Sequence, residues 1–130
     1  HSIGIIMLDI NSFKKINDTL GHQTGDRLLK AVAEKLRKTL RTSDSIIRYG
    51  GDEFMVVIPE AGEEIRLVLG RIRDAIKDDA EIEHIVGHAV SVSLGYAIWD
   101  SDSETTMEET IDMADSWMYR DKQEYHGRET

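Results

Sequence analysis

The chain has 130 residues, of which 40% are hydrophobic and 32% are charged, a balance that suits one globular domain with a core of its own. Its 16 Lys and Arg residues against 25 Asp and Glu residues give a formal net charge of −9. This charge argues against nucleic acid as a partner, because affinity for phosphate backbones comes mainly from basic side chains. The absence of cysteine excludes disulfides, thiolate catalysis and cysteine-based zinc sites.

Hydrophobic periodicity along the chain predicts a mixture of strands and helices. In chain order, the predicted elements are a strand at residues 3–8, helices at 11–20 and 25–40, hairpin strands at 46–49 and 54–58, a helix at 63–77, a strand at 88–98 and a final helix. The segment 78–87 is expected to be a polar connector with room for a short extra strand. Thr106 and Glu109 form a capping box that starts the final helix.

The order of these elements predicts the fold class. Strands and helices do not alternate strictly, which favours an α+β domain with a central, mostly antiparallel sheet flanked by helices, as in ferredoxin-like folds. No internal repeat and no Pro- or Gly-rich linker divides the sequence. We therefore expect residues 1–130 to form one domain.

Acidic residues lie at two strand ends that this fold would bring together. Asp9 ends the first strand, and Asp52 and Glu53 follow Gly50 and Gly51 at the hairpin tip. Clustered carboxylates repel one another unless a cation lies among them, and Mg²⁺ accepts such ligands together with water and substrate phosphates. The two glycines would let the backbone approach a nucleotide closely. The alternative is that these residues only form turns.

Four stretches of the sequence resemble, in order, the GGDEF family of diguanylate cyclases. They are "MLDINSFKKINDTLGHQTGDRLL", "RYGGDEF", "VSVSLGYA" and "ADSWMYRDK". The resemblance covers nearly the whole chain and implies the family's palm-like nucleotide-cyclase version of the α+β fold. The family's usual stretch before the first strand, of the form DxLTGLxNR, is absent. The resemblance thus indicates a GGDEF domain at residues 1–130 that lacks its N-terminal helix and turn.

The resemblance also implies an activity. GGDEF proteins condense two GTP molecules into cyclic di-GMP and release two pyrophosphates. The reaction depends on Mg²⁺, with Mn²⁺ as a substitute, and needs a homodimer because each domain holds one GTP. An upstream sensory or dimerising region of a longer parent chain is expected to drive it, with the domain in the cytoplasm, free or below a membrane anchor. The alternative is a non-catalytic regulatory module that binds GTP or cyclic di-GMP.

By the same resemblance, four residues match the metal and reaction centre. Asp9, Asp52 and the Ile10 carbonyl would bind the metals. Asp52 or Glu53 would favour loss of the 3′-hydroxyl proton of GTP, and the sequence does not distinguish between them. Two cations near the reacting phosphates would neutralise the charge that builds up during the displacement.

Four further residues match the family's nucleotide-binding positions. Asn17 and Asp26 correspond to the residues that read guanine, whose ring N–H and exocyclic amine suit a carboxylate acceptor. Lys14 and Lys122 correspond to residues that contact the phosphates. The alternative roles are structural: Asp26 would cap a helix, Asn17 would close one, and both lysines would be solvated surface charges.

A regulatory site is implied just before the hairpin. Arg41 and Asp44 fit the family's RxxD motif, where cyclic di-GMP binds and inhibits the enzyme. A second arginine often completes that site, and either Arg71 or Arg73 would serve. The alternative is a simple surface ion pair. Near the C-terminus, Arg128 lies farther from Lys122 than the family's phosphate-contacting arginine does, so its role stays open.

Overall fold

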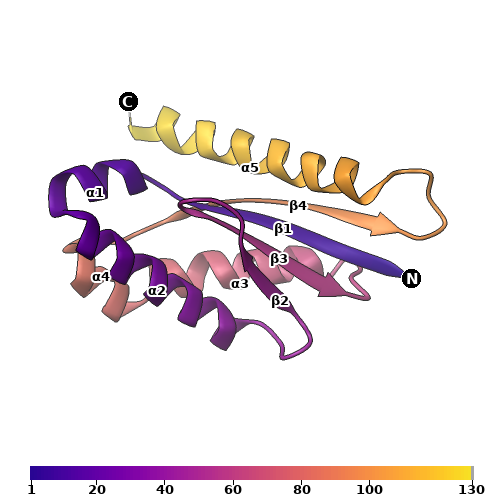
Figure 1. Ribbon diagram of the computed structural model, residues 1–130, viewed down its shortest axis with the longest axis horizontal. Helices are drawn as coiled ribbons and strands as arrows, with labels where there is room; N and C mark the ends of the chain where they lie inside the picture. Colours follow the sequence, from indigo (N-terminus) through magenta and orange to yellow (C-terminus); the bar gives the residue numbers. More distant parts are fainter. Residues whose placement is uncertain (130) are drawn as a thin grey trace.

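The computed structural model describes residues 1–129, and the side chains of residues 1–127; the side chain of Arg128 lies outside this part. Four strands and five helices make up the described chain (Figure 1). They are β1 (Ser2–Ile10), α1 (Phe13–Leu20), α2 (His22–Thr39), β2 (Ser45–Arg48), β3 (Glu53–Pro59), α3 (Ile65–Lys77), α4 (Ala80–Val86), β4 (Val92–Asp100) and α5 (Met107–Glu129).

The strands form one sheet in the order β2-β3-β1-β4, and every neighbouring pair is antiparallel. The long helix α5 covers one face of this sheet, and α2, α3 and α4 lie on the other (Figure 1). This arrangement confirms the predicted α+β fold with an antiparallel central sheet. It also places β1 beside β3, which is the pairing that the predicted carboxylate cluster requires.

The central strand β1 is apolar along most of its length because both of its faces are buried. Ile6 and Leu8 point into the larger core beneath α2, α3 and α4, whereas Ile5 and Met7 point into the smaller core beneath α5. A strand of this kind reads as a continuous hydrophobic run rather than as an alternating pattern. The strand extends to Ile10, so Asp9 is the last residue but one of β1 and does not lie beyond its end.

The small residues on one face of β4 allow α5 to pack closely against it. A Cβ atom added at Gly95 would lie 2.1 Å from the backbone oxygen of Ala114 and 2.2 Å from the backbone nitrogen of Met118. Large and small residues alternate along β4, and the small ones lie on the face that α5 covers. The predicted capping box is also confirmed, since Glu109 N donates to Thr106 Oγ1 at 3.1 Å and Thr106 N donates to Glu109 Oε1 at 3.1 Å.

The prediction of a polar connector at residues 78–87 is wrong, because this segment contains the helix α4 and no strand. Asp79 caps this helix by accepting a hydrogen bond from Ile82 N at 2.9 Å, and Gly87 ends it with φ 90°. Ile82 and Val86 anchor the helix in the core. Within the described residues, no helix combines the length and the apolar character needed to cross a membrane.

Candidate functional site

The predicted carboxylates meet at one end of the sheet. Asp9 on β1 lies directly opposite Glu53 on β3, and Ile10 N donates a long hydrogen bond of 3.4 Å to the Asp52 carbonyl. Residues opposite each other in an antiparallel pair point to the same face, so Asp9 and Glu53 share the face covered by α5. Only 2% of Asp9 is exposed, whereas Asp52 and Glu53 are half-buried.

The electrostatics of this cluster disfavour full ionisation. Burial, together with the hydrogen bond and charge of the adjacent Asp52 side chain, raises the pKa of Asp9 to about 7 despite the opposing effect of Lys122. Burial, followed by the charges of Asp115 and Asp52, also raises the pKa of Glu53. The protein thus holds several carboxylates close together, where an additional cation would lower the electrostatic cost.

Lys122 on α5 supplies one positive charge to this cluster. Its Nζ atom lies 2.6 Å from Asp9 Oδ2, and this hydrogen bond is the main cause of the raised pKa of Lys122. The other oxygen of the same carboxylate, Asp9 Oδ1, is buried and has no hydrogen-bond partner among the described residues. A buried acceptor without a donor is costly unless a ligand satisfies it.

These residues fit a hard cation. Among residues 1–127, whose side chains the structure describes, no three His, Asp or Glu side chains lie close enough together to hold a metal ion by themselves. Two carboxylates and a backbone carbonyl would leave several positions for water and phosphate oxygens, which is how Mg²⁺ is usually bound. The unpartnered Oδ1 of Asp9 gives such an ion a first ligand.

The turn between β2 and β3 is held by a residue that the sequence reading did not single out. Arg48 Nη2 donates to the Gly51 carbonyl at 2.7 Å, and Tyr49 N donates to the Glu53 carbonyl at 2.9 Å. Gly50 and Gly51 are exposed. The sequence feature that could have indicated this role is an arginine two residues before the glycine pair.

The predicted guanine-reading residues lie on α1 and α2, on the other side of the sheet. Asp26 is exposed and lines a hollow of about 490 Å³ together with Arg48 and Phe54. The alternative that Asp26 caps a helix is wrong, because α2 begins at His22 and its N-cap is Gly21. Asn17 lies in the last turn of α1, where its backbone carbonyl accepts a hydrogen bond from Gly21 N at 2.9 Å.

The two predicted phosphate-binding lysines occupy different surroundings. Lys122 joins the carboxylate cluster, whereas Lys14 is an exposed residue of α1. Lys14 is thus free of the cluster and open to solvent at the end of the sheet where α1 begins (Figure 1).

The predicted inhibitory residues lie at the far end of α2. Asp44 is almost buried and accepts a hydrogen bond from Arg41 N at 3.0 Å, while the Arg41 guanidinium is largely exposed and only 3.8 Å from Asp44 Oδ1. Arg41, Asp44 and Arg71 are among the residues that line a small hollow beside this turn. Arg73 instead pairs with Asp121 at 2.9 Å, so Arg71 is the arginine that stands beside the RxxD motif.

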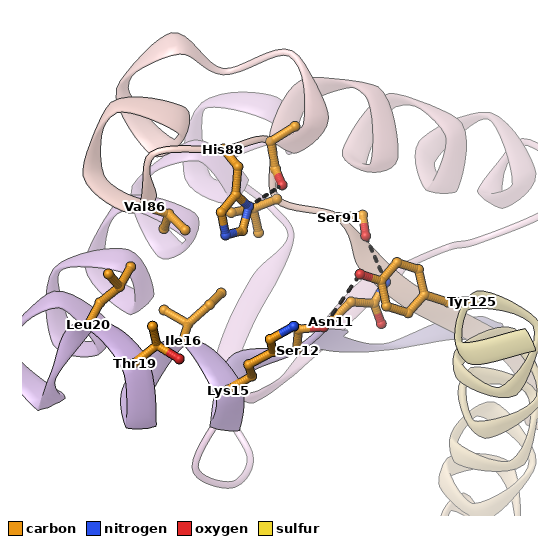
Figure 2. Close-up of a pocket in the computed structure, with 12 residues that line it drawn as sticks. Asn11, Ser12, Lys15, Ile16, Thr19, Leu20, Val86, His88, Ser91 and Tyr125 are labelled. Carbon is orange, nitrogen blue, oxygen red and sulfur yellow. Dashed lines mark hydrogen bonds between the residues drawn. The ribbon is translucent and has the colours of Figure 1, made fainter. Parts of the chain in front are cut away.

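Asn11, the residue after β1, carries a buried polar network that sequence reasoning missed. Asn11 Nδ2 donates to Ser91 Oγ at 2.9 Å (Figure 2). Ser93 Oγ donates to Asn11 Oδ1 at 2.6 Å. The next residue, Ser12, has a left-handed backbone with φ 61°. The network thus connects the turn between β1 and α1 to the start of β4. The residues it joins are about 80 positions apart, so no local sequence pattern predicts the contact.

A hollow of about 370 Å³ opens beside this network, between α1 and the loop from α4 to β4 (Figure 2). Lys15, Ile16, His88 and Tyr125 are among the residues that line it. None of the four clustered residues Asp9, Asp52, Glu53 and Lys122 does so. This hollow is therefore a neighbour of the carboxylate cluster and not part of it.

The fold and the site define an α+β domain with a cluster of carboxylates at one end of an antiparallel sheet. Comparison with known proteins identifies its family: the chain belongs to the family described as "Diguanylate cyclase, GGDEF domain", which matches residues 1–128. The resemblance stated from the sequence motifs is thereby confirmed. The fold prediction is confirmed too, since solved GGDEF domains superpose on this structure.

Three similar proteins illustrate the relationship. The chain is 40% identical over 119 residues to the diguanylate cyclase DgcP of Pseudomonas aeruginosa, an alignment that covers 91% of this chain but only 17% of that protein. The crystal structure of the diguanylate cyclase SiaD with its activator SiaC, from Pseudomonas aeruginosa, matches with a TM-score of 0.84 and 32% identity over 95% of this chain and 47% of that chain. The GGDEF domain of DgcB from Caulobacter crescentus, in complex with cyclic di-GMP, matches with a TM-score of 0.81 and 27% identity over 95% and 73% of the two chains.

Proposed function

We propose that this protein is a diguanylate cyclase domain that condenses two GTP molecules into cyclic di-GMP with release of two pyrophosphates. Each 3′-hydroxyl attacks the α-phosphate of the other GTP, so two copies of the domain, each holding one GTP, must face each other. The reaction depends on Mg²⁺ or Mn²⁺. Because GTP is a cytoplasmic nucleotide, the cytoplasm is the compartment in which the domain works.

One observation carries this proposal above the others. The pairing of β1 with β3 gathers Asp9, Asp52 and Glu53 beside an exposed Gly50–Gly51 turn, and it leaves a buried Asp9 oxygen without a partner. A domain that used these strands only as scaffold would gain nothing from such a cluster, because it costs stability without a cation. Family membership points to the same activity.

In this proposal Asp9, Asp52 and the Ile10 carbonyl hold the divalent cation. When bound, the cation neutralises charge on the reacting phosphates and favours ionisation of the attacking hydroxyl. Asp52 is committed to the cation in this proposal, so we assign Glu53, which lies opposite Asp9 on the neighbouring strand β3 and on the same face of the sheet, as the acceptor of the hydroxyl proton. Lys14 and Lys122 neutralise the phosphate oxygens as point charges.

Guanine is read by Asn17 and Asp26. The Asp26 carboxylate is exposed in the hollow between α2 and the hairpin, where it can accept hydrogen bonds from the ring N–H and the exocyclic amine of guanine. Adenine offers no equivalent pair of donors, so the site selects GTP over ATP.

Cyclic di-GMP inhibits the domain at a second site formed by Arg41, Asp44 and Arg71. The buried Asp44 fixes the turn, and the exposed Arg41 and neighbouring Arg71 present guanidinium groups to a phosphate or a guanine face. The solved DgcB GGDEF domain in complex with cyclic di-GMP supports binding of this product by the fold.

Incubation with GTP and Mg²⁺, followed by chromatography of the products, tests the function. Wild type is expected to form cyclic di-GMP, and Asp52→Asn to form at least about 100-fold less. Asp112→Asn, on an exposed position of α5, is the matched control and is expected to remain active. If wild type forms no product while GTP or cyclic di-GMP still raises its Tm, the protein is a nucleotide receptor and the proposal is wrong.

A further inference from the structure

Gly25 makes room for the side chain of Asn17. Gly25 lies on α2, one turn after the junction with α1, and its backbone nitrogen donates to the Gly21 carbonyl at 3.2 Å. A Cβ atom built on Gly25 would lie 1.8 Å from Asn17 Oδ1 and 2.9 Å from Asn17 Cγ. Real Cβ atoms essentially never approach a neighbour that closely, so the Asn17 amide occupies the space that any other residue at position 25 would fill.

No hydrogen bond to another described residue holds this amide in place. Asn17 Oδ1 is buried and has no partner among the described residues. Packing alone then holds the Asn17 side chain in its position, and the unpaired amide oxygen costs stability. The space above Gly25 is therefore what fixes the conformation of the Asn17 side chain.

Gly25 also has no conformational reason to be glycine. Its φ does not fall in the left-handed range, unlike that of Gly21 at 92° and Gly87 at 90°. Alanine would raise helix propensity at this position. A helical residue that is neither a turn nor a cap, and that lowers helix propensity, needs a packing explanation, and the contact with Asn17 provides it.

We propose that Gly25 is a positioning residue for base recognition: the missing side chain at position 25 lets the Asn17 amide lie against α2, next to Asp26. This inference rests on the proposed function, in which Asn17 and Asp26 read guanine. Gly25 touches no nucleotide itself, and it acts only through the rotamer of Asn17. Phe13 borders the same space, with its Cζ 3.4 Å from the built Cβ, which is tolerable contact.

The substitution Gly25→Ala tests this inference. Because the clashing atom is at the free end of a short side chain, Asn17 is expected to rotate away while both helices stay in place. We expect a Tm equal to or above that of wild type, and an affinity for GTP lowered between about 3-fold and 10-fold, the range for one lost hydrogen bond. The ratio of GTP to ITP affinity should fall as well, since ITP lacks the exocyclic amine.

Two further variants separate positioning from a general structural effect. Gly70→Ala places the same methyl group on a helical glycine with open space around it, so its GTP affinity and GTP-to-ITP ratio should match wild type. In an Asn17→Ala background, which removes the clash, adding Gly25→Ala should change GTP affinity no further.

Each outcome decides the matter. A Gly25→Ala variant that binds GTP and ITP as wild type does would overturn the inference, as would a loss of affinity that persists in the Asn17→Ala background. A large drop in the Tm of Gly25→Ala, absent from the double variant, would show that the helices move instead of Asn17, and this too contradicts it. If wild type itself shows no GTP binding, the proposed function has failed, which is a separate result.

Discussion

At the scale of single residues, the site is dominated by the compensation of one buried charge. Asp9 is 2% exposed and shares its surroundings with Asp52, so the Lys122 ammonium at 2.6 Å is the contact that offsets its charge. A cation bound at Asp9 would take over part of this task. Lys122 and a metal ion thus stabilise the same carboxylate: Lys122 does so when no cation is bound, and the cation shares the task when it is bound.

Replacing Lys122 tests this compensation. At pH 8, where an Asp9 with a pKa of about 7 is ionised, Lys122→Met should lower the free energy of unfolding by about 1–2 kcal/mol, or the Tm by about 5 °C, because the buried charge loses its partner. Mg²⁺ should then raise the Tm of the variant more than that of wild type, since no ammonium competes for Asp9. Thermal unfolding with and without Mg²⁺ measures both effects.

The exposed Lys38 on α2 offers a matched control, because Lys38→Met removes an equal charge away from the cluster. Its Tm and its response to Mg²⁺ should equal those of wild type. An unchanged Tm for Lys122→Met would show that the Lys122–Asp9 contact contributes nothing to stability.

Much of the carboxylate cluster could be predicted from local sequence, and its surroundings could not. An acid at a strand end and two acids after a Gly-Gly turn are visible within a few residues, and antiparallel pairing then brings them together. The contact of Lys122 with Asp9 spans 113 positions, and that of Gly25 with Asn17 depends on how α1 packs on α2. Such contacts follow from tertiary packing, which periodicity does not encode.

At the scale of elements, α4 shows how a short helix is held in place. Asp79 caps it and also forms an ion pair with Lys35 of α2 at 3.2 Å. Burial of Asp79 opposes ionisation, but the Ile82 amide and Lys35 outweigh it and hold the pKa of Asp79 below its usual value. The helix was not predicted because a segment of only seven residues, about two turns, carries little periodic signal.

The lowered pKa of Asp79 predicts a pH-dependent contribution to stability. Asp79→Ala should lower the free energy of unfolding by about 1 kcal/mol at pH 6, the usual cost of losing an N-cap residue. A carboxyl whose pKa is depressed by folding stabilises above its unfolded pKa of 3.8, and this stability is lost as the pH falls through the lower folded value. The difference between variant and wild type should therefore shrink below pH 4 in urea titrations.

Asp79→Asn is the control for this prediction. Asparagine caps helices as well as aspartate does, so only the ion pair with Lys35 is lost. Its destabilisation should be smaller than that of Asp79→Ala and should persist with little change between pH 6 and pH 4. A difference for Asp79→Ala that grows as the pH falls would contradict the assignment.

The packing of α5 on β4 gives a second prediction at this scale. Gly95→Ala places a methyl group against backbone atoms of α5, which cannot rotate away as a side chain can. We expect a loss of about 1–3 kcal/mol of stability, the usual range for overpacking, and weaker binding of GTP, because Lys122 shifts with the helix. Gly70→Ala, with open space around it, should show neither effect in urea unfolding and GTP titration.

At the scale of the whole molecule, α2 separates the two sites that we propose. From Asp26 to Thr39 the helix rises about 20 Å, so the nucleotide end of the domain and the Arg41–Asp44 turn are too far apart to share one ligand. Product bound at the second site would have to act by restraining how two domains approach each other.

Arg71 and Arg73, two positions apart and therefore on nearly opposite sides of α3, test the proposed regulatory site. Arg71→Ala should raise the concentration of cyclic di-GMP needed for half-inhibition by about 10-fold or more, because a guanidinium–phosphate contact is lost. Arg73→Ala should leave this concentration unchanged, since Arg73 pairs with Asp121. Initial rates measured over a range of added cyclic di-GMP provide the comparison. If Arg73→Ala relieves inhibition and Arg71→Ala does not, the assignment of Arg71 to this site is wrong.

The overall fold was largely predictable, for a physical reason. The buried strand β1, the amphipathic α2 and the alternating β4 each carry a period that matches one kind of element, and the short connections favour antiparallel neighbours. The boundaries were less accurate: α2 begins at His22 and not at residue 25, because Gly21 starts the next helix as well as ending the previous one.

The rate of cyclic di-GMP formation as a function of protein concentration tests the central claim most directly. If two copies must each bring one GTP to a shared reaction centre, the rate per protein molecule at saturating GTP and Mg²⁺ should rise with concentration and level off once dimers are complete. Asp52→Asn should show no product at any concentration. Product formation by wild type with a constant rate per molecule, down to the lowest concentrations, would contradict condensation between two domains.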